Sequence, residues 1–116
     1  MNFSLEEIAR VAHAANIEMQ AIGGDDMPSV PWLYEPRSVR ASALKGVERV
    51  RNGMTPQENH EHWCRYKTAQ GWTRGEKDPE KMTHPCLVPW DELPERERMK
   101  ALLFHAVVLA LSGSGS

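Results

Sequence analysis

The sequence lacks the excess of positive charge with which nucleic-acid-binding proteins neutralise phosphates. Lysine and arginine together number 14 and aspartate and glutamate 16, giving a formal net charge of −2 over 116 residues. We therefore expect no nucleic-acid partner. A local group of basic residues between Arg37 and Arg51 is interpreted as the solvated face of a helix.

Long apolar runs and a signal peptide are also missing. The longest apolar stretch, residues 101–111, is interrupted by His105 and is much shorter than the roughly 20 residues that span a bilayer. Glu6 and Glu7 lie in the N-terminal segment, where a signal peptide would be apolar or basic. These absences predict that the protein has no membrane partner and is cytoplasmic.

Cysteine is scarce, and its spacing does not match a metal site. Cys64 and Cys86 are expected to be reduced thiols. His60 and Cys64 share a helical face from which His62 points away, and His84 and Cys86 would point to opposite faces of an extended segment. Because neither a Cys-x-x-Cys nor a His-Glu-x-x-His motif is present, we predict no metal site.

Catalytic signatures are missing as well. The chain has no Gly-x-Ser-x-Gly motif, no glycine-rich loop that would hold phosphates and no paired carboxylates. His60 beside Glu61, or His84 near Asp91, are possible base–acid pairs, but neighbouring residues on a helix point in different directions. We therefore predict a protein that is not an enzyme and needs no cofactor.

Helical patterns are abundant. Behind a capping box at Ser4, apolar residues at spacings of three and four predict a helix over residues 5–20. A cap at Ser38 predicts a second helix over residues 38–52, and a capping box at Thr55 predicts a third over residues 55–70.

The remaining segments predict extended pieces and a last helix. Three prolines favour an extended path over residues 27–37, and the short pieces 71–73 and 86–88 are expected to pair. A last helix is expected from about residues 91–94 to Leu111, and because its second half is apolar on all faces it is either the central core helix or half of an interface. The expected fold class is mainly α, a small four-helix domain with a short two-stranded antiparallel β element.

One stripe of the third predicted helix has the composition of a binding surface. His60, Trp63 and Lys67 lie at positions i, i+3 and i+7 and so share a face. An indole between an imidazole and an ammonium suits a planar, anionic ligand such as a nucleotide. The alternative is that Trp63 is a core residue and His60 a buried, hydrogen-bonded histidine.

Four tryptophans in a chain with only two phenylalanines extend this hypothesis to other segments. Indoles are candidates for stacking, and the basic side chains near them are candidates for polar contacts. The predicted ligand-binding residues are Trp32, His60, Trp63, Lys67, Trp72, Lys81 and His84.

The segment 83–94 carries a recognisable signature. Its His-Pro-Cys-Leu-Val run, followed by an aromatic residue and a Leu-Pro helix start, resembles the ryanodine receptor repeat, or RyR domain. His60-Glu61-His62-Trp63 is similar to the family's H-E-x-W, and Gly71-Trp72 followed by Gly75 resembles its G-W-x-x-G. The order and spacing hold from about Val47 to Leu111, and the N-terminal part resembles the stand-alone bacterial and phage versions.

The resemblance implies a single repeat domain over residues 1–111, with residues 112–116 a flexible tail or a scar of expression cloning. It implies a cytoplasmic binding module in a bacterium or a phage-infected host. The ligand would be an adenine nucleotide or an ADP-ribose-derived signal such as cyclic ADP-ribose, which a viral protein would sequester as an anti-defence measure. Because channel repeats pair, it also implies a homo-oligomer, expected to be a dimer. The alternative is a structural interaction module without a small ligand, in which signature residues such as Asp91 only hold loops and helix ends.

Overall fold

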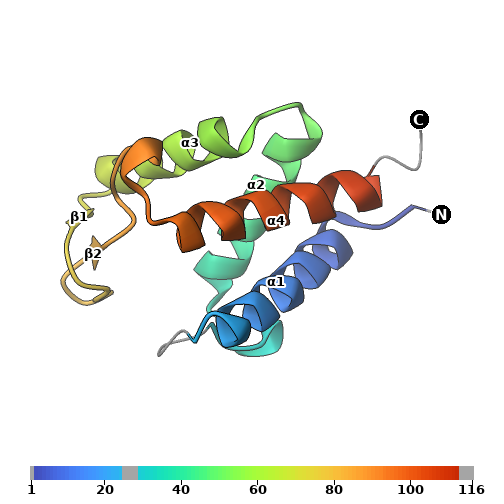
Figure 1. Cartoon of the computed structure of the whole chain (residues 1–116), viewed down its shortest axis with the longest axis horizontal. Coiled ribbons are helices and arrows are strands. Elements are labelled where there is room, and N and C mark those ends of the chain that lie inside the picture. Colours follow the sequence, from blue (N-terminus) through green and yellow to red (C-terminus); the bar gives the residue numbers. More distant parts are fainter. Residues whose placement is uncertain (1, 25–28, 113–116) are drawn as a thin grey trace.

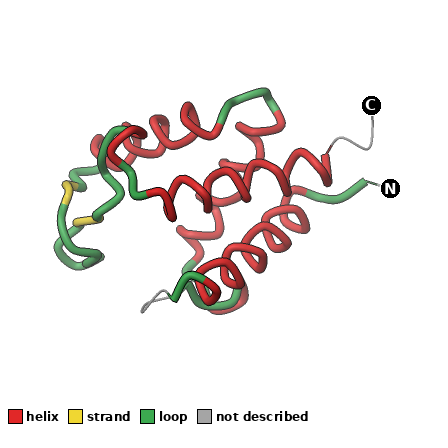
Figure 2. The backbone as a smooth tube through the Cα atoms, viewed as in Figure 1, coloured by secondary structure: helices red, strands yellow, loops and turns green. Residues whose placement is uncertain are grey.

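The computed structural model describes residues 2–24 and 29–112, which form four α-helices, two short strands and two single 3-10 turns (Figures 1 and 2). In chain order these elements are α1 (Leu5–Ile22), η1 (Trp32–Tyr34), α2 (Arg37–Arg51), α3 (Pro56–Ala69), β1 (Thr73–Arg74), β2 (Thr83–His84), η2 (Trp90–Glu92) and α4 (Glu95–Ser112).

Both predicted capping boxes are present and explain where α1 and α3 begin. The Ser4 hydroxyl accepts a hydrogen bond from the Glu7 backbone N–H at 3.1 Å, and the Glu7 carboxylate accepts from the Ser4 N–H at 2.8 Å. Thr55 and Glu58 repeat the arrangement at 3.1 and 2.9 Å. Each box satisfies two N–H groups that would otherwise have no partner in the first turn of the helix.

The start predicted for α2 is two residues too late. Pro36, not Ser38, occupies the N-cap position, and Arg37 is the first helical residue. The backbone carbonyl oxygen of Pro36 accepts hydrogen bonds from the N–H groups of Val39 and Arg40 at 3.0 and 3.1 Å. The start of α2 therefore has no side-chain cap, and the backbone of Pro36 is extended, with φ −59° and ψ 152°.

The helix α4 is the central element, which is one of the two alternatives predicted for it. It lies between α1 and α3 in Figure 1 and packs against α1, α2 and α3, most extensively against α1. The buried residues that form the hydrophobic core are Ile8, Ala9, Trp32, Val47, Val50 and Val108. None of them belongs to α3, which has no fully buried residue.

The predicted antiparallel β element is wrong in orientation and in position. The strands β1 and β2 are parallel, with Thr73 opposite Thr83 and Arg74 opposite His84. The second strand is β2 at Thr83–His84, and residues 86–88, which were expected to form it, lie outside any strand.

The parallel orientation arises because the intervening loop reverses the chain twice. Asp78 forms an antiparallel bridge with Thr83, so the segment around Asp78 runs opposite to β2 and therefore also opposite to β1. The second reversal passes through Met82, whose φ of 56° is in the left-handed region. The prediction of antiparallel strands assumed one chain reversal between them, whereas this loop contains two.

Two further expectations concern membrane-spanning helices and the C-terminal tail. Within the part of the chain that the structure describes, no helix combines the length and apolar character required to cross a membrane. Ser112, the first residue of the predicted tail, is the last residue of α4, and residues 113–116 lie outside the described residues.

We predict that Ile8→Ala lowers the free energy of unfolding by about 2–5 kcal/mol, because truncating a fully buried side chain leaves a cavity in the α1–α4 core. Ile8 is 1% exposed, whereas Val11 on the same helix is 48% exposed. The matched control Val11→Ala should change the stability by no more than about 0.5 kcal/mol. Urea denaturation followed by circular dichroism measures both, and equal losses would contradict the assignment of the core.

Candidate functional site

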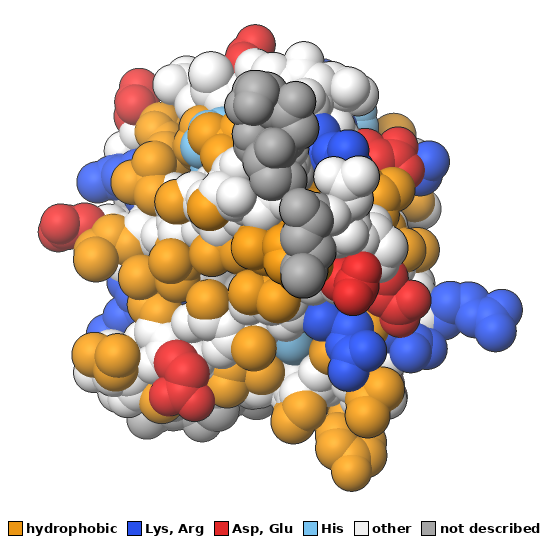
Figure 3. Space-filling model, turned by 90° about the vertical axis from the view of Figure 1, so that its right-hand side faces the viewer, with side chains coloured by type: hydrophobic (Ala, Val, Ile, Leu, Met, Phe, Trp, Pro, Cys, Tyr) orange, Lys and Arg blue, Asp and Glu red, His pale blue; other side chains and the backbone are white. Residues whose placement is uncertain are grey.

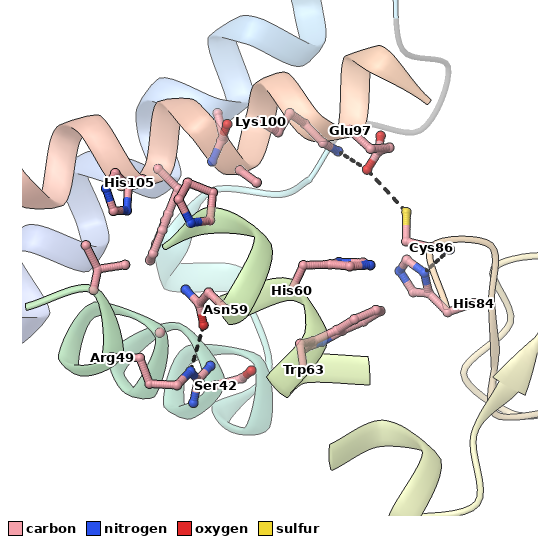
Figure 4. A pocket seen from close by; sticks show the side chains of 16 residues that line it. Ser42, Arg49, Asn59, His60, Trp63, His84, Cys86, Glu97, Lys100 and His105 are labelled. Atoms are coloured by element: carbon pink, nitrogen blue, oxygen red, sulfur yellow. Dashed lines mark hydrogen bonds and ion pairs between the residues drawn. The ribbon is translucent and has the colours of Figure 1, made fainter. Parts of the chain in front are cut away.

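A cavity of about 320 Å³ lies between α2, α3 and α4 and is closed at one end by the segment that follows β2 (Figure 4). Gly46, Phe104 and Ala101 contribute its apolar surface together with Val50 and Pro56. The polar and aromatic lining residues labelled in Figure 4 are Ser42, Arg49, Asn59, His60, Trp63, His84, Cys86, Glu97, Lys100 and His105.

The helix α3 forms one wall because the His-Pro-Cys-Leu-Val segment holds it there. His60 Nε2–H donates to the backbone carbonyl of Val88 at 2.8 Å, and the Cys64 thiol points at the same carbonyl from 3.7 Å. The His60 ring also stacks on Trp63 with 5.9 Å between ring centroids and lies 6.0 Å from the ring of Trp90. His60 is therefore a hydrogen-bonded, half-buried histidine that also lines the cavity, and its role in ligand binding stays a prediction.

The end of the cavity near β2 is built from His84 and Trp63. The edge of one ring faces the other, with 5.1 Å between centroids and an interplanar angle of 78°. The backbone N–H of Cys86 donates to His84 Nδ1 at 3.0 Å, so a neutral His84 carries its proton on Nε2. Burial, aided by the charge of Lys77, lowers the pKa of His84 to about 4, and the imidazole is neutral at pH 7.

The expectation that His84 and Cys86 point to opposite faces is wrong, since both line the cavity. The segment from His84 to Cys86 leaves β2 and turns, and the N–H of Leu87 donates back to the carbonyl of His84 at 3.4 Å. Two-residue alternation applies to extended chain only. Even so, no three histidine, cysteine or acidic side chains gather as a possible metal site anywhere in the described ranges.

The two cysteines are free thiols that stay protonated at neutral pH. The Cys86 thiol donates to Glu97 Oε1 at 3.4 Å, and burial together with the Glu97 charge raises its pKa to about 12. Burial also raises the pKa of Cys64. Because the thiolate is the reactive form of cysteine, neither side chain is activated as a nucleophile.

The opposite end of the cavity is formed by Arg49 on α2 and Asn59 on α3. Arg49 Nε donates to Asn59 Oδ1 at 2.6 Å, and burial lowers the pKa of Arg49 from its ordinary value. Asn16 Oδ1 and His105 Nδ1 also line this cavity, and neither makes a hydrogen bond in the described chain. A ligand with complementary donors and acceptors would satisfy such groups.

The seven predicted ligand-binding residues separate into two groups. His60, Trp63 and His84 line the cavity, and that they bind a ligand stays a prediction. The other four, which do not line it, are Trp32, Lys67, Trp72 and Lys81.

Burial and side-chain contacts explain why these four residues do not line the cavity. Trp32 is only 6% exposed and packs edge-on against His13, so it belongs to the core. Lys67 places its ammonium 4.4 Å from the centre of the Trp72 ring, and this cation–π pair lies outside the cavity. Lys81 is exposed in the loop before β2.

Several lining residues outside the predicted ligand-binding set come from α2 and α4, chiefly Arg49, Glu97, Lys100 and Phe104. Arg49 belongs to the basic group that was interpreted as a solvated helical face, yet it is partly buried and lines the cavity. The helices that carry these residues were predicted, but which faces meet depends on tertiary packing. One local signal was present: a glycine inside a predicted helix often marks a close approach. A Cβ on Gly46 would lie 3.4 Å from the ring of Phe104.

A second hollow of about 430 Å³ lies on the other side of His60 and is lined by α3 and residues 87–89. Glu61 and Arg65 supply its charges, and the His60 imidazole is the one aromatic ring among its lining residues. Since it offers no indole or phenyl surface for stacking, the cavity between α2, α3 and α4 is the better candidate for a planar ligand.

We predict that acidification from pH 7 towards pH 4 destabilises the protein in part through His84. The unfolded state binds a proton near pH 6.5 and the folded state only near pH 4, so the unfolding free energy falls over this range. After a discount for the exposed part of the ring, the contribution is about 1–2 kcal/mol. The difference in stability between the wild type and His84→Gln, measured by urea denaturation, should shrink by this amount, and parallel pH profiles would contradict the assignment.

A comparison with protein families matches the part of the chain that forms most of this cavity. A family model described as the RyR domain matches residues 34–108, which run from the end of η1 to the last turns of α4. The match therefore includes every lining residue of the cavity except Asn16. It covers well over half of the 116 residues, and this chain belongs to the RyR domain family.

Proposed function

We propose that this RyR domain binds a small nucleotide-like molecule in the cavity between α2, α3 and α4 and does not transform it. The ligand class is an adenine nucleotide or an ADP-ribose-derived signal such as cyclic ADP-ribose. In a virus, such a protein would act by sequestering the signal from its host. The observation that carries the proposal is that Trp63 lines the same cavity as the cations Arg49 and Lys100.

The chemistry of the lining supports a planar, anionic ligand. An indole offers a face on which a base stacks, and guanidinium and ammonium groups bind phosphate oxygens. Asn59 and Ser42 add neutral hydrogen-bonding groups from α3 and α2. Aromatic and apolar walls with a few polar groups are typical of small-molecule sites.

The size of the cavity limits the ligand. A volume of about 320 Å³ lies at the lower end of the range for ligand pockets, roughly 300–1,000 Å³. A mononucleotide matches this volume best. A larger molecule, such as a nucleotide with a second ribose, would extend beyond the mouth of the cavity.

The state of the nucleophilic groups supports binding without catalysis. The Cys86 thiol is held protonated beside Glu97, and Nδ1 of His84 already accepts a backbone N–H. A catalytic thiol must be converted to the thiolate by a base. The base that Cys86 contacts is the Glu97 carboxylate, whose negative charge disfavours a thiolate beside it.

We predict that calorimetry detects binding of ATP, ADP-ribose or cyclic ADP-ribose at micromolar protein, and that Trp63→Leu weakens it. Loss of one stacked base costs about 1–3 kcal/mol, which corresponds to roughly five- to 150-fold in the dissociation constant. The matched control is Trp72→Leu, which removes an indole outside the cavity and should leave the affinity within about twofold of wild type.

Two outcomes would contradict the proposal. One is the absence of heat with all three compounds. The other is equal weakening by Trp63→Leu and Trp72→Leu when both proteins are folded by circular dichroism.

A second function, self-association, is favoured by one specific feature of α4. Exposed apolar side chains follow one stripe of this helix at helical spacing, and no charged residue interrupts the stripe. Its members are Met99, Leu102, Ala106, Leu109 and Ala110. Hydrophobic side chains gather in a band on the face of the molecule that Figure 3 shows. Contiguous exposed apolar surface of this kind is typical of interaction sites.

We predict that a dimer formed through this stripe dissociates in Leu102→Glu, because a carboxylate would be buried at the interface without a partner. Leu102 is 51% exposed, so the monomer tolerates the change. Leu33→Glu, at a residue of η1 that is 71% exposed, is the control and should leave the assembly intact. Sedimentation velocity measures all three proteins, and a wild type that remains monomeric up to about 100 µM, well above the micromolar dissociation constants of specific complexes, would contradict this function.

A further inference from the structure

Two cations line the cavity, but only one of them lacks a counter-charge. Lys100 Nζ lies 3.1 Å from Glu97 Oε1, and this is the one ion pair among residues 2–24 and 29–112. Arg49 has no carboxylate within ion-pair distance in that part of the chain. The one hydrogen bond that its guanidinium makes within the described residues runs from Nε to the neutral amide oxygen of Asn59 at 2.6 Å.

An uncompensated guanidinium in a partly buried position is unfavourable for a protein without a ligand. Removing a charge from water carries a free-energy cost that a counter-ion or a set of hydrogen bonds must offset. The burial that lowers the pKa of Arg49 shows that its surroundings disfavour the charged form, and the nearby charge of Glu48 opposes this effect only in part. A bound anion would supply the missing compensation.

The shape of the Arg49 guanidinium favours one class of anion. Since Nε is used by Asn59, the two terminal nitrogens of Arg49 are left for a ligand. A guanidinium presents parallel N–H groups that match two oxygens of a phosphate, whereas an ammonium acts as a single point charge. Ser42 and Asn59 lie on the same side of the cavity as Arg49 in Figure 4, and both side chains carry neutral hydrogen-bonding groups.

The opposite side of the cavity differs in character. Figure 4 shows Glu97, Cys86 and His84 together at that end, near the Trp63 ring. At that end the Glu97 carboxylate pairs with the Lys100 ammonium at 3.1 Å, so the two charges offset each other, and the neutral His84 imidazole adds no positive charge. A flat, uncharged group fits this end better than a phosphate does.

We propose that Arg49 is the anion-binding residue of the cavity and that it sets the orientation in which the ligand binds. The phosphoryl group lies against Arg49, and the ring system lies at the Trp63 and His84 end. The ligand class is accordingly a phosphate monoester or pyrophosphate of a nucleoside, and a nucleoside without phosphate binds weakly. This inference rests on the proposed function, because it requires the cavity to be the binding site.

The test is calorimetry of the full chain with adenosine, AMP, ADP-ribose and inorganic pyrophosphate. Arg49→Gln should weaken AMP and ADP-ribose by about ten- to hundredfold, since hydrogen bonds to charged groups contribute about 1.5–3 kcal/mol. Adenosine should bind wild type and Arg49→Gln with affinities that agree within about twofold. Lys100→Gln should weaken AMP less than Arg49→Gln does, because Lys100 is already paired with Glu97.

Two further variants test whether a loss of AMP affinity comes from the Arg49 guanidinium itself or from a general loss of positive charge. Arg49→Lys keeps the charge and should retain part of the affinity for AMP, with a loss smaller than that of Arg49→Gln. Arg51→Gln removes an exposed cation from the same helix, outside the cavity, and should leave the affinity for AMP within about twofold of wild type. Circular dichroism of each variant checks that the helices are retained.

The outcomes separate this inference from the proposed function. Equal loss of adenosine and AMP affinity in Arg49→Gln, or no loss of AMP affinity, would overturn the role of Arg49 while leaving the cavity as a binding site. Binding of pyrophosphate that depends on Arg49, with no binding of any nucleoside or nucleotide, would support the anion site and overturn the nucleotide function. Binding of none of the four compounds would overturn both.

Discussion

The hydrogen bond from His60 to the Val88 carbonyl is the contact on which the rest of the site depends. The helix α3 has no fully buried residue and so contributes little to the hydrophobic core. Its position is set instead by polar and aromatic contacts with the segment that follows β2, whose Val88 and Leu93 are buried. These contacts hold α3 from the side of residues 84–93, and α3 also packs against α2 and α4 around the cavity.

This arrangement explains why the His-Pro-Cys-Leu-Val run combines two roles. The backbone of Val88 fixes α3, while the side chains of His84 and Cys86 close one end of the cavity. The hydrogen bond from the Cys86 N–H to His84 Nδ1 fixes the tautomer of the imidazole, and burial keeps it neutral. A segment that holds a helix in place and also lines the cavity beside it is constrained at nearly every position.

The helices could be predicted from the sequence because their signals are local. Capping boxes at Ser4 and Thr55 and the apolar spacing behind them act within a few residues. The β element could not be predicted, because its parallel orientation depends on two reversals in one loop. The same limit applies to the site: Trp63 of the α3 stripe lines the cavity, whereas Lys67 contacts Trp72 outside it, and the two cations that line it, Arg49 and Lys100, come from α2 and α4. Which cation meets which ring depends on how helices dock, and that information is spread over the whole core.

The most direct measurement of the central claim is an NMR titration that follows the indole N–H signals of the tryptophans as ADP-ribose is added. Trp63 lines the cavity, Trp32 is sealed in the core and Trp72 lies outside under Lys67, so each signal reports a different environment. Our account predicts that the Trp63 signal shifts in a saturable manner while those of Trp32 and Trp72 stay in place. A Trp63 signal that does not move at saturating ligand, or a shift confined to Trp72, would contradict it.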